Sequence, residues 1–217
     1  MVKTIFILKS DAVPHGLFAE QIRTEAAALL EAEIRSLRYT VTEEPPPFGV
    51  IPYDKSCAAC LSVVSDREVV ATRLRSHPFF YSACEVNEVI PVSNDADRPA
   101  VQPTPGICLL TLFNRKRSID RGTFLHRWHN GHTPLSLRIH PLWSYIRNEV
   151  TRHLAGCPFD GIVEEQVRER CHITNPIIFF GGPLVFVWNM IRTFFDTWGF
   201  IDYPTMETYF TREYRLR

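Results

Sequence analysis

Residues 124–135 hold the side chains whose types and spacing are best suited to chemistry. At about 100° per residue, a helix places Phe124 and Trp128 on one apolar stripe, and His132 falls inside that stripe. Pro134 is expected to end the helix after His132, because a proline ring clashes with the preceding turn. An imidazole with an ordinary pKa of about 6.5 can exchange protons near neutrality, so His132 is a candidate general acid or base. The alternative is a core histidine bonded to a backbone carbonyl.

Further candidates flank this segment. Tyr145, on an expected strand over residues 142–150, is a candidate catalytic residue whose hydroxyl would orient a substrate oxygen; a half-buried strand tyrosine is the ordinary alternative. Asn148 has the opposite strand parity, so both side chains cannot face one cavity without a bulge. Arg115 opens a basic run that either binds a substrate carboxylate or belongs to a solvated loop. Trp128 fits core packing better than chemistry.

The spacing of possible metal ligands argues against a metal centre. His126, His129 and His132 spread over roughly 120° of a helix, whereas zinc ligands on one helix favour positions i and i+4. Cys57 and Cys60 have the spacing of a redox or zinc pair, but no second pair accompanies them, and the start of a buried strand is the simpler interpretation. We expect no metal and no cofactor, since phosphate-binding and dinucleotide-binding glycine motifs are missing as well.

Composition narrows the class of protein. The 217 residues include 24 Lys plus Arg and 24 Asp plus Glu, so the formal net charge is zero. Nucleic-acid binders normally carry a positive excess, and a neutral chain has no polybasic attraction to a membrane surface. The apolar stretch at residues 177–191 is interrupted by Gly181, Gly182 and Pro183 and is shorter than the roughly 20 residues of a membrane span. The short apolar run at residues 4–8 does not resemble a signal peptide, and we expect a cytoplasmic protein with reduced cysteines.

A proline-rich stretch over residues 93–105 reads as a linker between two halves, residues 1–92 and 106–217. The hydrophobic pattern predicts the order βαββαβ in both halves. In the first half the strands are expected near residues 4–8, 39–42, 58–64 and 84–91, with helices over 16–37 and 65–75. In the second half they are expected over 107–113, 142–150, 159–167 and 206–217, with helices over 121–132 and 185–200. The sequence therefore predicts an α+β fold with two ferredoxin-like repeats.

The second half resembles the EthD family of dimeric α+β barrel proteins. The resemblance rests on a basic strand end at residues 115–117, a helix with Phe124, Leu125, Trp128, His132, Pro134 and Leu135, and a strand with Tyr145, Ile146 and Asn148. The first half lacks this motif. The resemblance implies a barrel whose two halves lie in one chain, with His132 and Tyr145 as catalytic residues. It implies substrate-binding roles for Trp128, Phe124, Asn148 and Arg115.

This resemblance also implies a function. Proteins of the family are associated with small hydrophobic or aromatic compounds, including polyketides, and relatives with the same barrel act as cofactor-free monooxygenases. We therefore expect a cofactor-independent enzyme, of monooxygenase or cyclase type. The alternatives are a non-catalytic binding or assembly protein and a haem-binding barrel protein, with His132 or His129 as the iron ligand. The aromatic-rich residues 174–200 either pack in a core or interface, or wall an apolar pocket. A homodimer is a further expectation.

Overall fold

The structure is a computed structural model that describes residues 3–31, 34–65, 68–93 and 103–216. Its first half contains β1 (Lys3–Ser10), α1 (His15–Leu30), β2 (Ser36–Val41), β3 (Cys57–Val64), α2 (Glu68–Arg75) and β4 (Phe80–Val92). Its second half begins with β5 (Ile107–Phe113), α3 (Arg121–His126), a π-helical turn (Arg127–His132), α4 (Thr133–Ile139), β6 (Ser144–Ala155) and β7 (Gly161–Val167). The chain ends with α5 (Cys171–Thr174), α6 (Pro176–Phe179), α7 (Phe186–Trp198), a 3-10 turn (Tyr203–Thr205) and β8 (Glu207–Arg215).

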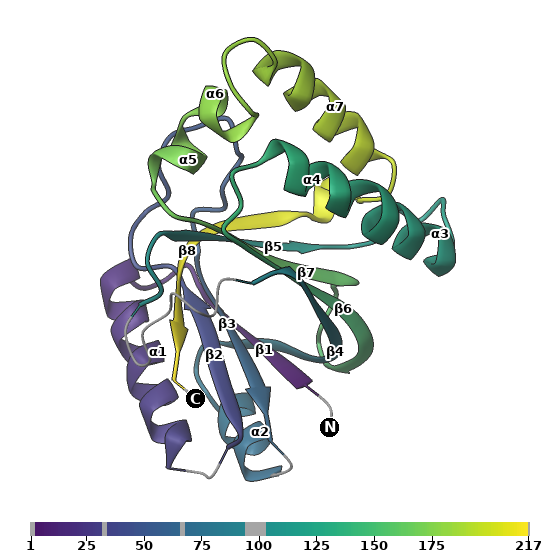
Figure 1. The fold of residues 1–217 in the computed structure, drawn as a ribbon. Coiled ribbons are helices and arrows are strands. Elements are labelled where there is room, and N and C mark those ends of the chain that lie inside the picture. Colours follow the sequence, from purple (N-terminus) through teal and green to yellow (C-terminus); the bar gives the residue numbers. More distant parts are fainter. Residues whose placement is uncertain (1–2, 32–33, 66–67, 94–102, 217) are drawn as a thin grey trace.

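All eight strands form one closed antiparallel barrel, in the order β1-β3-β2-β8-β5-β7-β6-β4. The two halves join where β2 pairs with β8 and where β4 pairs with β6. At the first junction the rings of Tyr39 and Tyr214 stack with their centroids 4.8 Å apart. Helices α1 and α2 cover the outside of the first half, and the helices from α3 to α7 cover the outside of the second (Figure 1). The fold is therefore an α+β barrel whose two halves are closed against each other.

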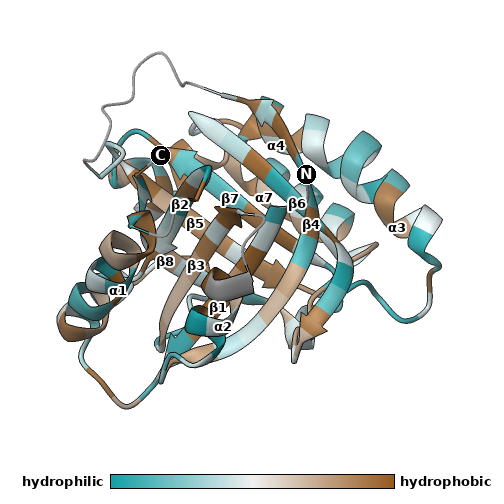
Figure 2. Ribbon diagram, turned by 90° about the horizontal axis from the view of Figure 1, so that it is seen from below, coloured by the Kyte–Doolittle hydropathy of each residue, from teal (hydrophilic) through white to brown (hydrophobic). Residues whose placement is uncertain are grey.

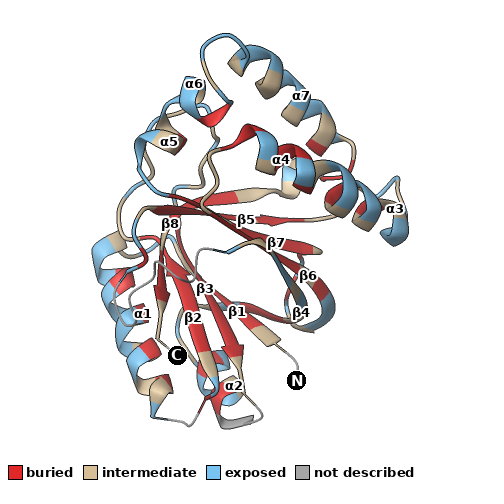
Figure 3. Ribbon diagram, viewed as in Figure 1, coloured by how far each residue is buried: buried red, intermediate tan, exposed pale blue. Residues whose placement is uncertain are grey.

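Alternation along the strands gives this barrel two buried faces, because successive side chains point to opposite sides of a strand. Strands β4 and β6 carry alternating hydrophilic and hydrophobic residues (Figure 2). On the inner face, apolar side chains such as Ile5, Leu110 and Ile162 form one cluster. On the outer face, separate apolar clusters lie under the helices. Burial on both faces makes most strand positions buried (Figure 3).

The inner face also holds a cluster of charges that links the two halves. Arg38 on β2 donates to Glu164 on β7 at 2.7 Å and to Glu88 on β4 at 3.0 Å. Lys3 pairs with Glu88 and donates to the side-chain carbonyl of Asn148 at 3.1 Å. Burial raises the pKa of Glu88, but the charges of Arg38 and Lys3 outweigh it and hold that pKa below its ordinary value. Charged side chains from both halves thus bind one another inside the barrel.

Several expectations from the sequence need correction. The helix expected over residues 16–37 ends at Leu30, because residues 36–41 form β2 between β3 and β8. Pro134 does not end its helix, and the chain stays helical through Ile139. Cys57 does begin strand β3, and all of the described cysteines are free. Residues 94–102 of the expected linker lie outside the described residues, so the domain boundaries stay a prediction.

The aromatic-rich segment before β8 divides into two groups. Phe179, Phe180 and Phe200 are buried beneath the helices. Trp188 and Phe195, on the outer face of α7, are 67% and 66% exposed. Among the helices of the described residues, none combines the length and the apolar character needed to cross a membrane.

Candidate functional site

A cavity of about 170 Å³ lies between the outer face of the second-half sheet and its helical cover. The four strands of that sheet contribute side chains that include Leu109, Tyr145, Glu165 and Thr208, and the π-helical turn, α4 and α7 close the opposite side. An engineered protein cavity of roughly 150 Å³ holds benzene, which sets the scale. The cavity therefore has room for about one aromatic ring.

An unbroken helical stretch carries the key side chains to this cavity. It begins at Asp120, whose carboxylate caps the helix by accepting from the backbone N–H of Thr123 at 2.8 Å, as the sequence indicates. Its middle is the π-helical turn, where the N–H of Thr133 bonds the carbonyl of Trp128, five residues back. Single π-helical turns inside α-helices are rare and frequently mark functional sites.

The π-helical turn explains how Pro134 is accommodated. In the π-helical pattern the N–H of residue 134 would bond the carbonyl of His129. Residue 134 is a proline and has no N–H, so this carbonyl lacks that donor. Arg147 from β6 approaches this carbonyl at 3.5 Å and donates to the hydroxyl of Thr133 at 2.8 Å. Arg147 thus links β6 to the helical stretch at the π-helical turn, next to His132.

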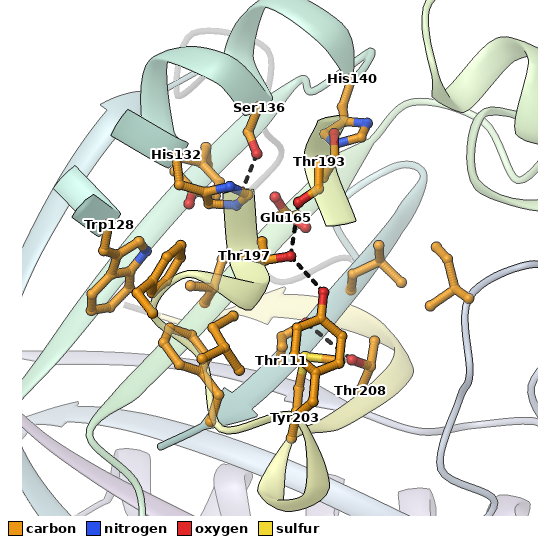
Figure 4. A pocket seen from close by; sticks show the side chains of 18 of the residues that line it. Thr111, Trp128, His132, Ser136, His140, Glu165, Thr193, Thr197, Tyr203 and Thr208 are labelled. Carbon is orange, nitrogen blue, oxygen red and sulfur yellow. Dashed lines mark hydrogen bonds between the residues drawn. The ribbon is translucent and has the colours of Figure 1, made fainter. Parts of the chain in front are cut away.

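The His132 ring is held through both nitrogens. Its Nδ1 lies 2.8 Å from the carboxylate of Asp196 on α7. Its Nε2 lies 3.1 Å from the hydroxyl of Ser136 on α4 (Figure 4). A carboxylate only accepts hydrogen bonds, so Nδ1 carries the proton when the ring is neutral. Nε2 is then the basic nitrogen, and it lies on the wall of the cavity.

Tyr145 and Glu165 stand side by side on the sheet beneath the helices, because they are paired residues of β6 and β7. The side chain of Tyr145 is completely buried, and its hydroxyl lies near the side chains of Thr133 and Trp128 without a hydrogen bond of regular geometry to either. Burial raises the pKa of both side chains above their ordinary values. For Glu165 the charge of His132 opposes this shift. The polar side chains of Tyr145 and Glu165 thus line a cavity that is otherwise largely apolar.

The remaining wall is aromatic. Trp128, fully buried, packs edge-on against Phe113 with ring centroids 5.0 Å apart, and the ring of Phe200 lies 5.5 Å from that of His132. His140 donates from Nδ1 to the carbonyl of Phe179 at 2.9 Å, and burial lowers its pKa to about 4. Since His140 is neutral around pH 7, its ring adds to the uncharged wall.

Of the residues predicted for the site, His132, Tyr145 and Trp128 line the cavity. Phe124 lies behind the wall, with its ring 5.5 Å from that of Trp128. Asn148 faces the barrel interior, where it donates to Glu164 at 3.2 Å, as its strand parity requires. Arg115 binds the backbone carbonyl of Ile119. The cavity therefore gives the expected substrate-binding roles of Phe124, Asn148 and Arg115 no support.

Sequence reasoning missed three residues of the site. Glu165 shares strand parity with buried Val163 and Val167, which is a signal for a carboxylate on a covered face. Asp196 is the sole acidic residue of the aromatic helix α7. Ser136 follows His132 by four residues, a helical spacing that places side chains together.

Comparisons with known proteins leave the identity of the chain open. No protein family's sequence profile matches it, and no curated protein sequence does. Among solved structures, a provisionally named monooxygenase from Lactobacillus acidophilus NCFM is similar to it, with a TM-score of 0.46 and 9% sequence identity. The alignment covers 99% of this chain and 93% of that chain. A similarity this distant supports no conclusion about activity.

Haem does not fit the site. A cavity of about 170 Å³, the scale of one aromatic ring, is smaller than a macrocycle of four pyrroles. His129 does not line this cavity. At the surface, Glu169, Cys171 and His172 bring three possible metal-ligand atoms within 4.8 Å of one another. These three residues are not part of the cavity wall.

Proposed function

We propose that this chain is a cofactor-independent, EthD-like enzyme that acts on a small apolar compound, with His132 as its general acid and base. The observation that supports this most is the basic Nε2 of His132 on the wall of the cavity, with Nδ1 bound to Asp196. A base whose other nitrogen is bound to a carboxylate keeps one tautomer and one orientation, which is what proton abstraction requires.

The internal repeat belongs to the same proposal. Residues 3–92 give the strand order β4-β1-β3-β2, and residues 107–215 give β6-β7-β5-β8. When the strands are numbered 1 to 4 within each half, the first order is 4-1-3-2 and the second is 2-3-1-4. The second order is therefore the first one read from the opposite end. This agreement supports two ferredoxin-like units in one chain, with the site built mainly on the second unit and Ile51 added to its wall by the first.

The chemistry starts with removal of a proton. His132 takes a proton from an acidic C–H or O–H of the compound, while the hydroxyl of Tyr145 donates to a developing oxygen charge. Trp128 and Phe113 wall the ring of the compound. The resulting anion reacts with dioxygen in a monooxygenase or closes a ring in a cyclase. Both outcomes need the same first step, and the cavity volume favours a single-ring compound or one ring of a longer molecule.

Proton abstraction can be tested with simple probes. Acetophenone has one ring and an acidic methyl group, whose exchange for deuterium in D2O is followed by proton NMR. We expect the protein to accelerate the exchange and His132→Ala to remove the acceleration. His126→Ala is the matched control, since His126 is exposed on the same helical stretch. A large loss of melting temperature in His132→Ala, with exchange retained, would show that His132 is structural.

A ligand-binding protein without catalysis is the second candidate. The hydrogen bond from Ser136 to Nε2 of His132 favours it, because that bond occupies the lone pair that a base needs. Saturation-transfer NMR measures binding of acetophenone separately from exchange. Binding without exchange, in both the unmodified protein and Ser136→Ala, would support this candidate over the enzyme.

A further inference from the structure

Glu165 is a carboxylate in an unusual place. It lies on β7 between Leu109 of β5 and Tyr145 of β6, which are its paired residues on the neighbouring strands. Its neighbour in sequence, Glu164, points into the barrel and binds Arg38 at 2.7 Å. Glu165 points the other way and lines the cavity together with His132. The two adjacent glutamates therefore have different surroundings.

The surroundings of Glu165 favour its protonated form. Burial raises the pKa of Glu165, and the charge of His132 lowers it. No hydrogen bond to a described residue contributes to this pKa. Glu165 is half-buried on the cavity wall, and a carboxylate that is partly withdrawn from water and has no donors holds its proton more tightly than one in water. Enzymes use such pairs of titratable groups with different environments as acid and base.

We infer that Glu165 is the acid partner of His132 and that the site catalyses allylic isomerisation of small cyclic ketones, in which a proton moves between two carbons. This inference rests on the proposed function, since it uses His132 as the base, and it adds a second catalytic residue and a substrate class. The matching substrate is one ring that carries a carbonyl group and a carbon–carbon double bond two carbons away.

The step is balanced without an oxidant or a reductant. Nε2 of His132 removes a proton from the carbon between the carbonyl group and the double bond, and Glu165 gives its proton to the carbonyl oxygen. The electron pair of the broken C–H bond forms a new double bond, which produces a dienol. His132 then returns its proton to the far carbon of the old double bond, and Glu165 recovers the enol proton. The product is the conjugated ketone, and both side chains are back in their starting forms.

Other groups around the cavity are compatible with these roles. Asp196 from α7 is bonded to His132 and supports the charge that the ring gains. Tyr145 from β6 lines the cavity, and its hydroxyl can donate to the same carbonyl oxygen. His140, which follows α4, and Tyr203 also line the cavity. Both are uncharged at neutral pH, since burial lowers the pKa of His140 and raises that of Tyr203.

The test uses 3-cyclohexen-1-one, whose conversion to 2-cyclohexen-1-one is followed by ultraviolet absorbance of the conjugated product. We expect the unmodified protein to accelerate the conversion and Glu165→Gln to lower kcat/KM at least about 100-fold, the usual contribution of one acid. The plot of kcat/KM against pH should lose its alkaline limb in Glu165→Gln, because the limb reports ionisation of the acid. Glu169→Gln, an exposed carboxylate outside the cavity wall, should leave the rate and the profile unchanged.

Two results would overturn the inference. One is the absence of isomerisation by the unmodified protein. The other is a Glu165→Gln variant with more than half of the original kcat/KM and an unchanged pH profile. In either case, acceleration of acetophenone exchange that depends on His132 would leave the proposed function standing. Loss of that exchange reaction as well would remove both.

Discussion

Asp196 binds Nδ1 of His132 at 2.8 Å although 64 residues of sequence separate the two. One residue lies on α7 and the other on the π-helical turn, so the contact depends on the packing of α7 over the sheet. The orientation of the base is thereby set by a helix whose outer face is largely exposed. A long-range contact of this kind makes the tautomer of His132 a property of the folded state.

Replacement of Asp196 by Asn should change the tautomer of His132. An asparagine amide can donate to Nδ1, which moves the ring proton to Nε2 and removes the basic lone pair from the cavity. We expect deuterium exchange of acetophenone to fall by about 10²- to 10⁴-fold, as expected for loss of a correctly oriented base. Nitrogen-15 NMR of the imidazole reads the tautomer directly. Asp11→Asn, at an exposed position, is the control; an unchanged tautomer in Asp196→Asn would contradict the prediction.

Arg38→Met should destabilise the barrel strongly. It removes the cation that Glu88 and Glu164 share, and a buried ion pair that loses one partner costs about 3–5 kcal/mol. Arg73→Met is the matched control, because Arg73 pairs with Glu25 at the protein surface and such pairs contribute about 0–1 kcal/mol. Urea unfolding of the three proteins measures both values. Equal losses in the two variants would show that the inner charge cluster does not stabilise the barrel.

Glu165→Gln should stabilise the protein at neutral pH. Burial raises the pKa of folded Glu165 above its ordinary value of 4.5, so the folded state holds the proton more tightly than the unfolded state does. As pH rises from 4.5 through the raised pKa, ionisation of Glu165 favours unfolding, and glutamine lacks this penalty. The stability difference between the variant and the unmodified protein should therefore be small near pH 4 and grow towards pH 8. Urea midpoints across this range measure it, and a constant difference would contradict the prediction.

More of the fold than of the site could be predicted from the sequence. Strand β5 follows directly from residues 107–113, whose apolar side chains fit a strand covered on both faces, and strand parity alone places Asn148 away from Tyr145. The π-helical turn could not be predicted, because a proline such as Pro134 in a helical pattern normally marks the end of the helix. Nor could the contact with Asp196, since no local pattern specifies how α7 packs on the sheet. The alternation of residues along a strand predicts which face of the sheet each side chain occupies. Tertiary packing decides which polar side chains come into contact.

Gly161→Ala should disturb the aromatic wall of the cavity. A Cβ at this position would lie 2.6 Å from the ring of Phe113 and 2.9 Å from that of Trp128, closer than side chains approach one another. Both rings are buried, so they have to shift towards the cavity, and overpacking of this kind costs about 1–3 kcal/mol. We expect Gly161→Ala to lower the urea midpoint and to weaken binding of acetophenone measured by NMR titration. Gly49→Ala is the control, because a Cβ at that position would meet no atom within 4 Å. An unchanged Kd in Gly161→Ala, together with a lowered midpoint, would mean that the two rings do not shape the ligand site.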